Sequence, residues 1–298
     1  MARPELPPSL PPLPLVQSPV FAAAVSSLGA DVEELVLPFG RATVLRRRFW
    51  PGICVRLLSR GPVWTSEPSE ADRAETFRHL SRSAPCLVTP GMTEDVAALR
   101  TAGFRQILTA AHLAEVSLDP DIGTMRQRLA GSWRNALGQA ERRGLHVTDL
   151  PFDRGRDEWL LARENAQRAR RGYRALPTAL VIAMAAHSPN DVRILSARLD
   201  RKSGPLSGII VIRHGSVATY HIGWTGSEGR HLRAGHLLLW HAMCRLADKG
   251  VTRLDLGTVD GQQAPGLMRF KLGTGAQVRA LGGTWARLIR PLAPMRRT

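Results

Sequence analysis

Apolar residues in the first half of the chain fall in short runs that predict alternating strands and helices. Runs of roughly four to eight apolar or alternating residues are typical of strands, and apolar positions at helical spacing predict helices. Ser69 predicts a helix N-terminus, because the acids Glu70 and Asp72 would interact favourably with the helix dipole. The expected elements are a helix at 20–28, strands at 32–37, 42–49 and 53–58, a helix at 69–81, a strand at 86–89, a helix at 93–102 and a strand region at 106–118.

The second half repeats this pattern with clearer signals. Gly144 and Gly250 each follow a helical stretch, where glycine commonly ends a helix. Tight turns at 201–204 and 214–215 predict three strands joined as a meander. The expected elements are helices at 121–143 and 156–171, strands at 192–199, 206–213 and 216–223, a helix at 237–247 and a strand at 251–256.

This order of elements predicts an α/β fold in which a mixed β-sheet is flanked by helices, once in each half of the chain. A chain of 298 residues exceeds the usual size of one hydrophobic core, so we expect two domains. The expected division is a proline-rich mobile tail at 1–18, an N-terminal domain at 19–115, a C-terminal, catalytic domain at 116–292 and a basic tail at 293–298.

Cysteine usage and the length of the apolar runs indicate a cytoplasmic protein. Cys54, Cys86 and Cys244 are an odd, widely spaced set without a CxxC pair, which argues against a disulfide framework and a zinc site. No apolar run reaches the roughly 18–20 residues that span a bilayer, and the start of the chain lacks the apolar core of a secretion signal. We therefore expect no integral membrane segment and no metal.

The chain is strongly basic, with a formal net charge of +16. Such a charge attracts phosphate-rich partners such as RNA, nucleotides or lipid head groups, although arginine-rich composition alone also produces it. Residues 126–174 hold twelve arginines against six acids. This segment is either a phosphate-binding surface or the solvated side of amphipathic helices.

Between residues 218 and 283 the run YHIGWTGSEGRHLRAGHLLLWHAMCRLADKGVTRLDLGTVDGQQAPGLMRFKLGTG resembles the C-terminal signature of the Fem-type aminoacyltransferases and their FemAB-like relatives. The shared order is an aromatic strand, a helix with LLLW, a strand ending in Asp-Leu-Gly, and Gly-Leu-x-x-Phe-Lys. RGPVW at 60–64 and RQRLAGSWRNALGQAERRGLHV at 126–147 match more loosely. The resemblance implies two GNAT (N-acetyltransferase) domains in tandem and an acyltransferase activity.

The resemblance implies that Phe270 and Lys271 stabilise the negative oxygen that forms during acyl transfer. The chain has only three lysines against 38 arginines, so a lysine here suggests a need for a compact ammonium. A lysine presents a point charge on a flexible stem, whereas arginine presents a planar fork suited to two-oxygen groups. The alternative interpretation is an ordinary surface lysine in solvent.

Five further positions are candidates for catalysis or substrate binding. Asp255 ends a predicted strand before Gly257, which is itself a candidate for substrate binding. Asp255 either orients the amine or the lysine, or simply caps a turn. Tyr220 and His221 lie near the end of a predicted central strand, and His221 is either a proton acceptor or a packing residue. Arg60, in RGPVW, is a candidate for holding an anionic acceptor.

The donor is expected to bind where acetyltransferases carry the loop Gln/Arg-x-x-Gly-x-Gly/Ala. This chain has Arg230-His-Leu-Arg233-Ala-Gly235, with Arg233 in place of the first glycine. That replacement weakens the approach of backbone amides to a pyrophosphate. Arg168 and Arg171 are further candidates for contacts with donor phosphates, and His236 and His241 are interpreted as structural.

These observations predict an N-acyltransferase of the FemAB-like, GNAT type. The expected donor is aminoacyl-tRNA, with acyl-CoA as the alternative, and no tightly bound cofactor is expected. The acceptor is an amine, for which the resemblance suggests a cell-wall precursor or a peptide. A hypothesis of a different class is a non-catalytic GNAT relative that binds RNA or another anionic partner.

Overall fold

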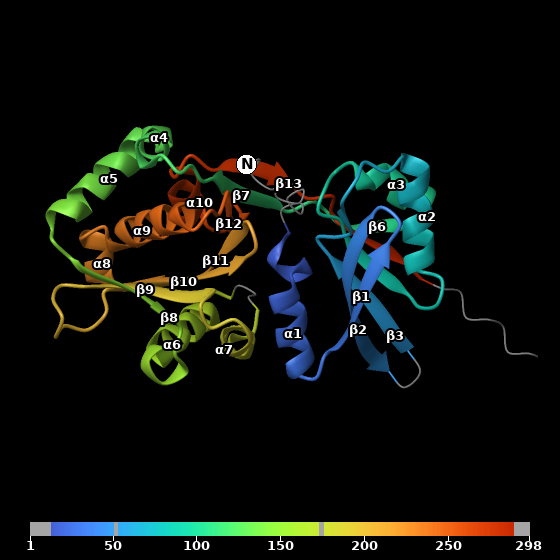
Figure 1. Ribbon diagram of the computed structural model, residues 1–298, viewed down its shortest axis with the longest axis horizontal. Coiled ribbons are helices and arrows are strands. Elements are labelled where there is room, and N and C mark those ends of the chain that lie inside the picture. Colours follow the sequence, from blue (N-terminus) through green and yellow to red (C-terminus); the bar gives the residue numbers. More distant parts are fainter. Residues whose placement is uncertain (1–12, 51–52, 173–175, 289–298) are drawn as a thin grey trace, which may run out of the picture. The chain divides into compact units, whose positions relative to one another are not determined.

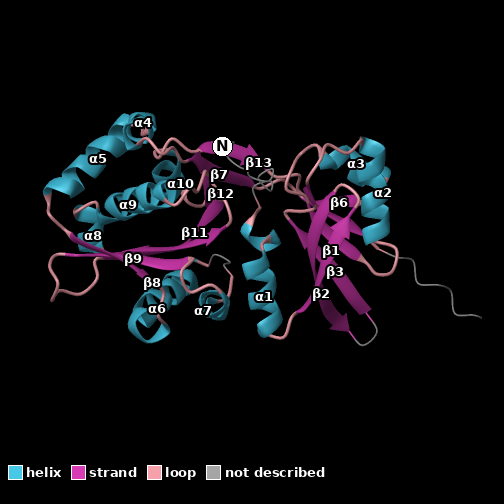
Figure 2. Ribbon diagram, viewed as in Figure 1, coloured by secondary structure: helices cyan, strands magenta, loops and turns pink. Residues whose placement is uncertain are grey.

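Two seven-stranded mixed sheets organise the chain in the computed structural model, which describes residues 13–50, 53–172 and 176–288 (Figures 1 and 2). Each sheet is the basis of one compact unit. Each sheet contains a parallel strand pair as well as antiparallel ones. None of the helices in the described part of the chain has the length and apolarity needed to cross a membrane.

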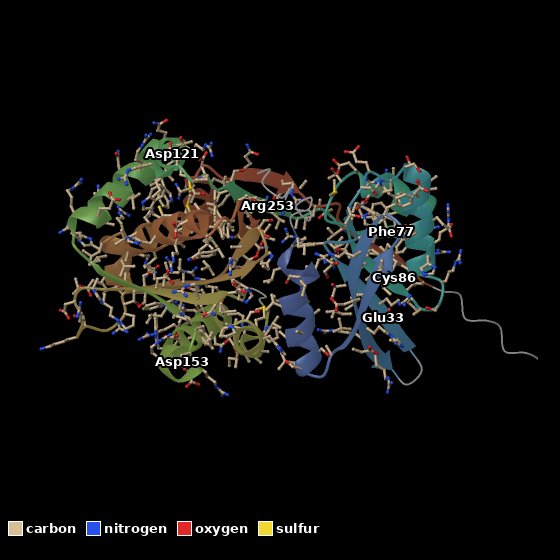
Figure 3. All side chains as sticks on the ribbon, in the orientation of Figure 1. Glu33, Phe77, Cys86, Asp121, Asp153 and Arg253 are labelled. Carbon is tan, nitrogen blue, oxygen red and sulfur yellow. The ribbon has the colours of Figure 1, made fainter. Side chains whose placement is uncertain are left out.

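The first unit consists of one sheet and two short helices, which share a hydrophobic core. Phe77 and Cys86 belong to this core, and both are almost fully buried (Figure 3). The capping interaction predicted at Ser69 is confirmed, because its side chain accepts a hydrogen bond from the Asp72 amide at 3.2 Å. The elements are β1 (Asp31–Leu37), β2 (Gly40–Trp50), β3 (Ile53–Ser59), β4 (Val63–Trp64), α2 (Glu70–Leu80), β5 (Cys86–Thr89), α3 (Asp95–Thr101), β6 (Arg105–Leu108) and β14 (Thr284–Arg287).

The second unit has helices on both faces of its sheet (Figures 1 and 2). Asp121 and Asp153 cap the helices that begin at residues 122 and 154 (Figure 3). The elements are a 3-10 helix η1 (Leu15–Gln17), α1 (Pro19–Ser27), β7 (His112–Ser117), α4 (Ile122–Arg128), α5 (Gly131–Arg142), β8 (His146–Pro151), α6 (Arg154–Arg171), α7 (Thr178–His187), β9 (Val192–Arg198), β10 (Ser207–His214), β11 (Val217–Thr225), α8 (Ser227–His231), α9 (Ala234–Asp248), β12 (Arg253–Val259), α10 (Pro265–Leu272) and β13 (Gln277–Ala280).

The strand orders show that sequence neighbours are not always neighbours in the sheet. The first sheet runs β1-β2-β3-β5-β14-β6, with β4 paired to β2. The second runs β13-β7-β12-β11-β10-β9-β8. The strand region expected at 106–118 is therefore two strands, β6 and β7, that belong to different sheets.

Each unit includes a short segment that the expected domain division had placed in the other. Helix α1 packs against α7 and belongs to the second unit, whereas β14 pairs with β5 and β6 in the first. The expected mobile tail also ends earlier than residue 18, because Leu15 and Ser18 are buried. Residues 1–12 and 293–298, the rest of the two expected tails, lie outside the described residues. Within the described residues, the first unit comprises 29–111 and 280–288, and the second 13–28 and 112–279.

The prediction of a single helix at 121–143 is wrong, because the structure has two helices there. Helix α4 ends at Arg128, and α5 begins at Gly131. Leu129 and Ala130 between them have extended backbone, with ψ angles of 138° and 145°. The Ala130 amide donates to the Gly273 carbonyl at 2.9 Å, so a tertiary hydrogen bond replaces a helical one.

Helices α9 and α6 cover opposite faces of the second sheet (Figure 1). Ile209 faces α9, because it packs in one core cluster with residues of that helix. The next position toward the N-terminus, Gly208, faces α6, where a Cβ atom would meet the Trp159 ring at 2.5 Å. Successive residues of a strand point to opposite faces, so α9 and α6 are separated by the sheet.

Candidate active site

Strands β11 and β12 separate from each other in the middle of the second sheet. They pair in parallel only over three positions, ending at Thr219 and Asp255. Beyond that point β11 stays paired with β10, and β12 pairs with β7. The backbone groups on the facing edges of the two strands are therefore no longer joined, which opens the sheet where the predicted catalytic residues lie.

Both strands carry an irregularity just beyond the point of separation. The register of β11 against β10 shifts at His221, which has no partner in the ladder. The register of β12 against β7 shifts between Asp255 and Thr258, and Gly257 has φ +77°. Such bulges bend a strand and increase its twist, which explains why the two strands diverge here.

Asp255 holds the irregular segment of β12. It is 2% exposed, and its Oδ1 atom accepts a hydrogen bond from the Gly257 amide at 2.7 Å. This contact two residues ahead is the turn-capping interaction that short acidic side chains make. The carboxylate also lies close enough to Lys271 to favour its charged form. Asp255 therefore caps the turn, as one sequence interpretation proposed, and its role in orienting the amine or the lysine stays a prediction.

Lys271 lies on α10 and is buried, with 7% of the residue exposed. Its Nζ atom donates a hydrogen bond to the Thr258 carbonyl at 2.7 Å. A Cβ atom at Gly257 would lie 3.7 Å from the same nitrogen, so the ammonium rests against the irregular part of β12. The interpretation of Lys271 as a surface lysine in solvent is therefore wrong.

Burial lowers the pKa of Lys271 from its ordinary value of 10.5 to about 8, and the Asp255 carboxylate opposes this shift. Desolvation disfavours the charged form of an amine, and a nearby negative charge favours it. The amine is therefore mostly protonated at neutral pH but loses its proton only slightly above it. It can supply positive charge at neutral pH within a mainly desolvated site.

Trp133 of α5 holds the backbone that carries Lys271. Its Nε1 atom donates to the Phe270 carbonyl at 3.0 Å. A Cβ atom at Gly273 would lie 2.5 Å from the Trp133 ring, so glycine permits the close approach. The Phe270 ring packs edge-on against His236 of α9, with 5.1 Å between centroids. Helices α5 and α9 thus fix the position of α10 from two sides.

Tyr220 and His221 lie on β11, on the other side of the opening. Tyr220 folds over Gly223, which lacks the Cβ atom that its ring would meet, and packs against the core. Burial lowers the pKa of His221 and of His236 to about 4, so both imidazoles are neutral at pH 7. These values make either histidine a weak proton acceptor and favour the packing interpretation.

The expected donor loop connects β11 to α9. Arg233 stands at the N-cap of α9 with φ +58°, the left-handed conformation that glycine adopts easily. No side chain caps this helix terminus, and Gly235 packs close to Thr225. Arg230 is held on the end of β11, because its guanidinium donates to the Thr225 carbonyl at 2.6 Å. The arginine at the glycine position therefore keeps the glycine-like turn.

Comparison with known proteins places this geometry in a known architecture. Residues 131–272 match the family model of the acetyltransferase (GNAT) domain. The structure of FemX superposes with a TM-score of 0.77 at 15% sequence identity, and the match covers 94% of each chain. A tandem GNAT protein from the clavulanic acid biosynthesis pathway gives 0.54 at 11% identity, with 96% of this chain and 90% of that one covered. The chain has a tandem GNAT fold.

A third structure shares this fold. L-PGS from Bacillus licheniformis superposes with a TM-score of 0.56 at 12% identity, covering 94% of this chain and 96% of that one. No curated protein matches the sequence. The two GNAT-like domains expected from the Fem-type resemblance are thus confirmed as the fold.

The GNAT fold brings together only part of the predicted site. Arg168 and Arg171 lie at the C-terminal end of α6, on the face of the sheet opposite α9. Arg60 belongs to the first unit, between β3 and β4. The basic segment 126–171 is divided in the same way, because α5 and α6 lie on different faces (Figure 1). It does not form one continuous phosphate-binding surface.

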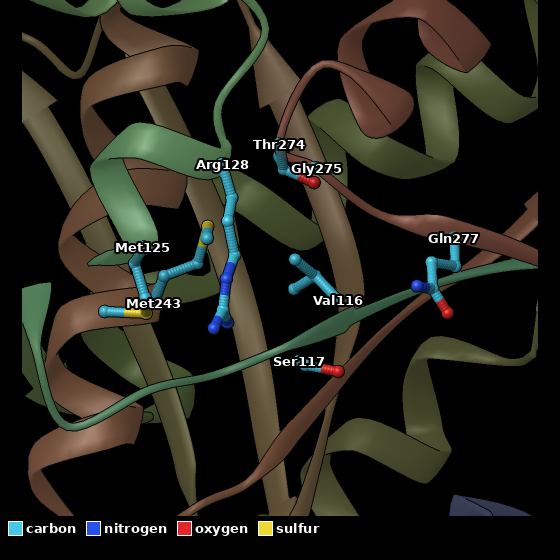
Figure 4. Close-up of a pocket in the computed structure, with 8 residues that line it drawn as sticks. All are labelled: Val116, Ser117, Met125, Arg128, Met243, Thr274, Gly275 and Gln277. Carbon is cyan, nitrogen blue, oxygen red and sulfur yellow. The ribbon is translucent and has the colours of Figure 1, made fainter. Parts of the chain in front are cut away.

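Some features of the site have no signal in the sequence. The Thr258 carbonyl and the Trp133 indole act through tertiary contacts that no local pattern predicts. A pocket of about 230 Å³ lies beside the loop after α10, with the Arg128 side chain between Met243 and Val116 (Figure 4). The described residues contain no group of three or more His, Cys, Asp or Glu side chains that could hold a metal ion.

We predict that the Lys271 amine titrates near pH 8, because its environment is mostly desolvated. The measurement is an NMR titration of protein labelled with ¹³C at lysine, in which three lysine signals are expected. Comparison with Lys271→Arg protein assigns the signal. An Nζ group that titrates at its ordinary value of 10.5 would contradict the burial of this amine.

We predict that Trp133→Phe raises the pKa of Lys271 toward its ordinary value, because a loosened Phe270 backbone admits water. The lost hydrogen bond should also lower the free energy of unfolding by about 0.5–1.5 kcal/mol. Trp285→Phe is the matched control, because Trp285 Nε1 donates to the Gly282 carbonyl at 2.7 Å in the first unit. The control should lose similar stability with no change in the Lys271 titration. An equal response of Lys271 in both variants would refute the positioning role of Trp133.

Proposed function

We propose that the protein is a Fem-like N-acyltransferase that transfers an aminoacyl group from aminoacyl-tRNA to an amine. The observation that carries the proposal is the buried Lys271 ammonium at the opening between β11 and β12. Burying a charged amine costs free energy, and titratable groups whose pKa values are shifted by burial cluster at functional sites. A module that only bound RNA through surface arginines would have no use for it.

The proposed reaction is nucleophilic acyl substitution at the carbonyl carbon of the donor. The acceptor amine forms a C–N bond, the carbonyl oxygen becomes negative, and the tetrahedral intermediate then breaks its bond to the donor oxygen. The amine loses a proton, and the departing oxygen gains one. Lys271 donates a hydrogen bond to the negative oxygen, because one of its three N–H groups is directed to Thr258 and two remain for the substrate. Phe270 and Asp255 position this ammonium.

The donor is proposed to lie along the loop before α9. Its phosphates would meet the uncapped N-terminus of α9 and the guanidinium groups of Arg230 and Arg233. Arg168 and Arg171, on the opposite face of the sheet, are proposed at most as contacts of a more distant part of a tRNA. Tyr220, His221 and Gly257 border the opening and are proposed to contact the acyl group or the amine.

Acyl-CoA remains the second candidate donor, and one observation favours it. Arg233 has the left-handed backbone that glycine adopts easily, and no side chain caps the N-terminus of α9, so backbone amides there are available to a pyrophosphate. The match to the acetyltransferase (GNAT) domain model agrees with either donor. The acceptor is proposed to be an amine of a cell-wall precursor or a peptide, with Arg60 as a candidate contact for an anionic group.

We predict that Lys271→Ala lowers turnover by about 100- to 1,000-fold, as expected for the loss of one donor to the negative oxygen. Labelled aminoacyl-tRNA and labelled acetyl-CoA are tested separately with a panel of amine-bearing peptides and cell-wall precursors, and products are identified by mass spectrometry. Lys249→Ala, at the exposed end of α9, is the control and should react like the unmodified protein.

The same assay separates the alternatives. Transfer from only one donor identifies that donor, and ribonuclease should abolish transfer from aminoacyl-tRNA alone. Equal turnover of Lys271→Ala and Lys249→Ala would refute the proposed role of Lys271. Tight RNA binding with no transfer from either donor would favour the non-catalytic alternative.

A further inference from the structure

A second pocket lies between α6 and the strands β8 and β9, on the face of the sheet opposite Lys271. Its volume is about 280 Å³, and it belongs entirely to the second unit. Three cross-strand pairs form its floor, because paired residues of an antiparallel ladder share a face. The pairs are His146 with Arg198, Thr148 with Ser196, and Leu150 with Ile194.

The floor changes in character from one end to the other. One end is cationic, with Arg198 beside His146, and the middle carries two hydroxyl groups. The far end combines apolar side chains with the Arg156–Asp157 ion pair, whose charges compensate each other. The wall is the N-terminal half of α6, and Arg201 from the loop after β9 lies at the cationic end. A ligand with an anionic group at the cationic end and a compact, partly apolar body matches this lining.

The positive charge of the pocket is not cancelled by the acid that lines it. Asp157 is buried and already paired, because its two oxygens accept hydrogen bonds from Arg156 at 2.8 and 2.6 Å. Among the described residues, neither Arg198 nor Arg201 has an acidic partner within salt-bridge distance. Two guanidinium groups therefore remain for an anion.

Asp200, beside the pocket, is occupied by its own loop. Its Oδ1 atom accepts hydrogen bonds from the amides of Lys202 and Ser203, at 2.7 and 2.8 Å. The Ser203 side chain and these amide bonds hold the pKa of Asp200 below its ordinary value, and the nearby His146 adds a smaller effect in the same direction. The carboxylate thus shapes the loop that carries Arg201.

Arg198 is held in place before any ligand arrives. Its Nη1 atom donates to the Ser203 carbonyl at 2.9 Å, which leaves the other guanidinium N–H groups to face the pocket. Thr148 and Ser196 bond to each other at 2.8 Å, so one hydroxyl donates to the other and the second keeps its proton for a ligand. A positioned cation and a free hydroxyl donor are the elements of an oxyanion-binding site.

The number of donors favours phosphate over carboxylate. Two guanidinium groups, a hydroxyl and the His146 ring exceed what two carboxylate oxygens accept, whereas a phosphate monoester offers three terminal oxygens. Apolar walls come from Leu150 and Ile194 at the opposite end and from Trp159, whose ring lies beside Gly208, the partner of Ser196. Trp159 is immobilised by its close contact with Gly208 and by edge-on packing with Trp224 at 6.1 Å.

We propose that this pocket binds a small phosphate monoester, with the phosphate at Arg198 and Arg201 and a compact apolar or aromatic group against Trp159. Its volume is near the lower end of ligand pockets, so the site accommodates one mononucleotide-sized unit. The sheet separates it from Lys271 and the loop before α9, so it is distinct from the proposed acyl-transfer site. The proposal does not depend on which donor that site uses.

The test is isothermal titration of the full chain with AMP, using adenosine and inorganic phosphate as its two fragments. AMP should bind more tightly than either fragment, and Arg198→Gln and Arg201→Gln should each weaken it at least about tenfold. Arg142→Gln, an exposed arginine on α5, and Lys271→Ala should leave AMP binding unchanged. Circular dichroism checks that each variant is folded.

A second titration, with tRNA as competitor, tests whether the phosphate belongs to a free small molecule or to an RNA chain. Displacement of AMP by tRNA from the unmodified protein shows that the site accepts the 5′-terminal phosphate monoester of an RNA chain, and no displacement shows that it takes a free small molecule. Binding of AMP that is no tighter than adenosine, or that survives both arginine substitutions, overturns the proposal. Loss of AMP binding in Lys271→Ala would place the ligand at the acyl-transfer site and overturn it as well.

Discussion

The rest of the second unit is arranged around one buried cation, the Lys271 ammonium. Removing an amine from water opposes its charge, and the lowered pKa of Lys271 reflects this cost. The Thr258 carbonyl and the Asp255 carboxylate keep the amine charged despite burial. The bulge in β12 exposes that carbonyl. The hydrogen bond from Trp133 to α10 fixes the backbone from which the lysine extends. An arginine would be too broad for a single carbonyl in this space.

The sheet separates the two proposed sites of this unit. On the side of α9 and α10, the separated strands, the buried amine and the uncapped helix terminus are suited to binding and activating an acyl donor. On the side of α6, a rigid tryptophan and two arginines without acidic partners are suited to a phosphate-bearing ligand. The bulges lie in β11 and β12, whereas β8 and β9 pair in a regular ladder beneath the second pocket.

Much of the fold follows from local patterns in the sequence, and most misses have a non-local cause. Alternating apolar runs predicted β1 to β3 and β9 to β12, and the Ser69 cap predicted α2. The break before Gly131 was missed because the bond from Ala130 to Gly273 joins distant segments. The apolar helix α7 has no polar face to give it a helical period, and β14 finds its partners about 180 to 200 residues earlier in the chain. In the site, the Phe-Lys motif pointed to a lysine that is buried beside the separated strands, and its role in acyl transfer stays a prediction. The position of Arg168 and Arg171 depended on which face α6 covers.

The most direct test of the account is the pH dependence of the ratio of kcat for the unmodified protein to kcat for Lys271→Arg. Titration of the acceptor amine affects both proteins and cancels in the ratio. The account predicts that the ratio falls as pH rises through about 8, because Lys271 loses its proton there and an arginine does not. A ratio that stays constant from one pH unit below this value to one unit above it would contradict the claim that a protonated Lys271 stabilises the reaction.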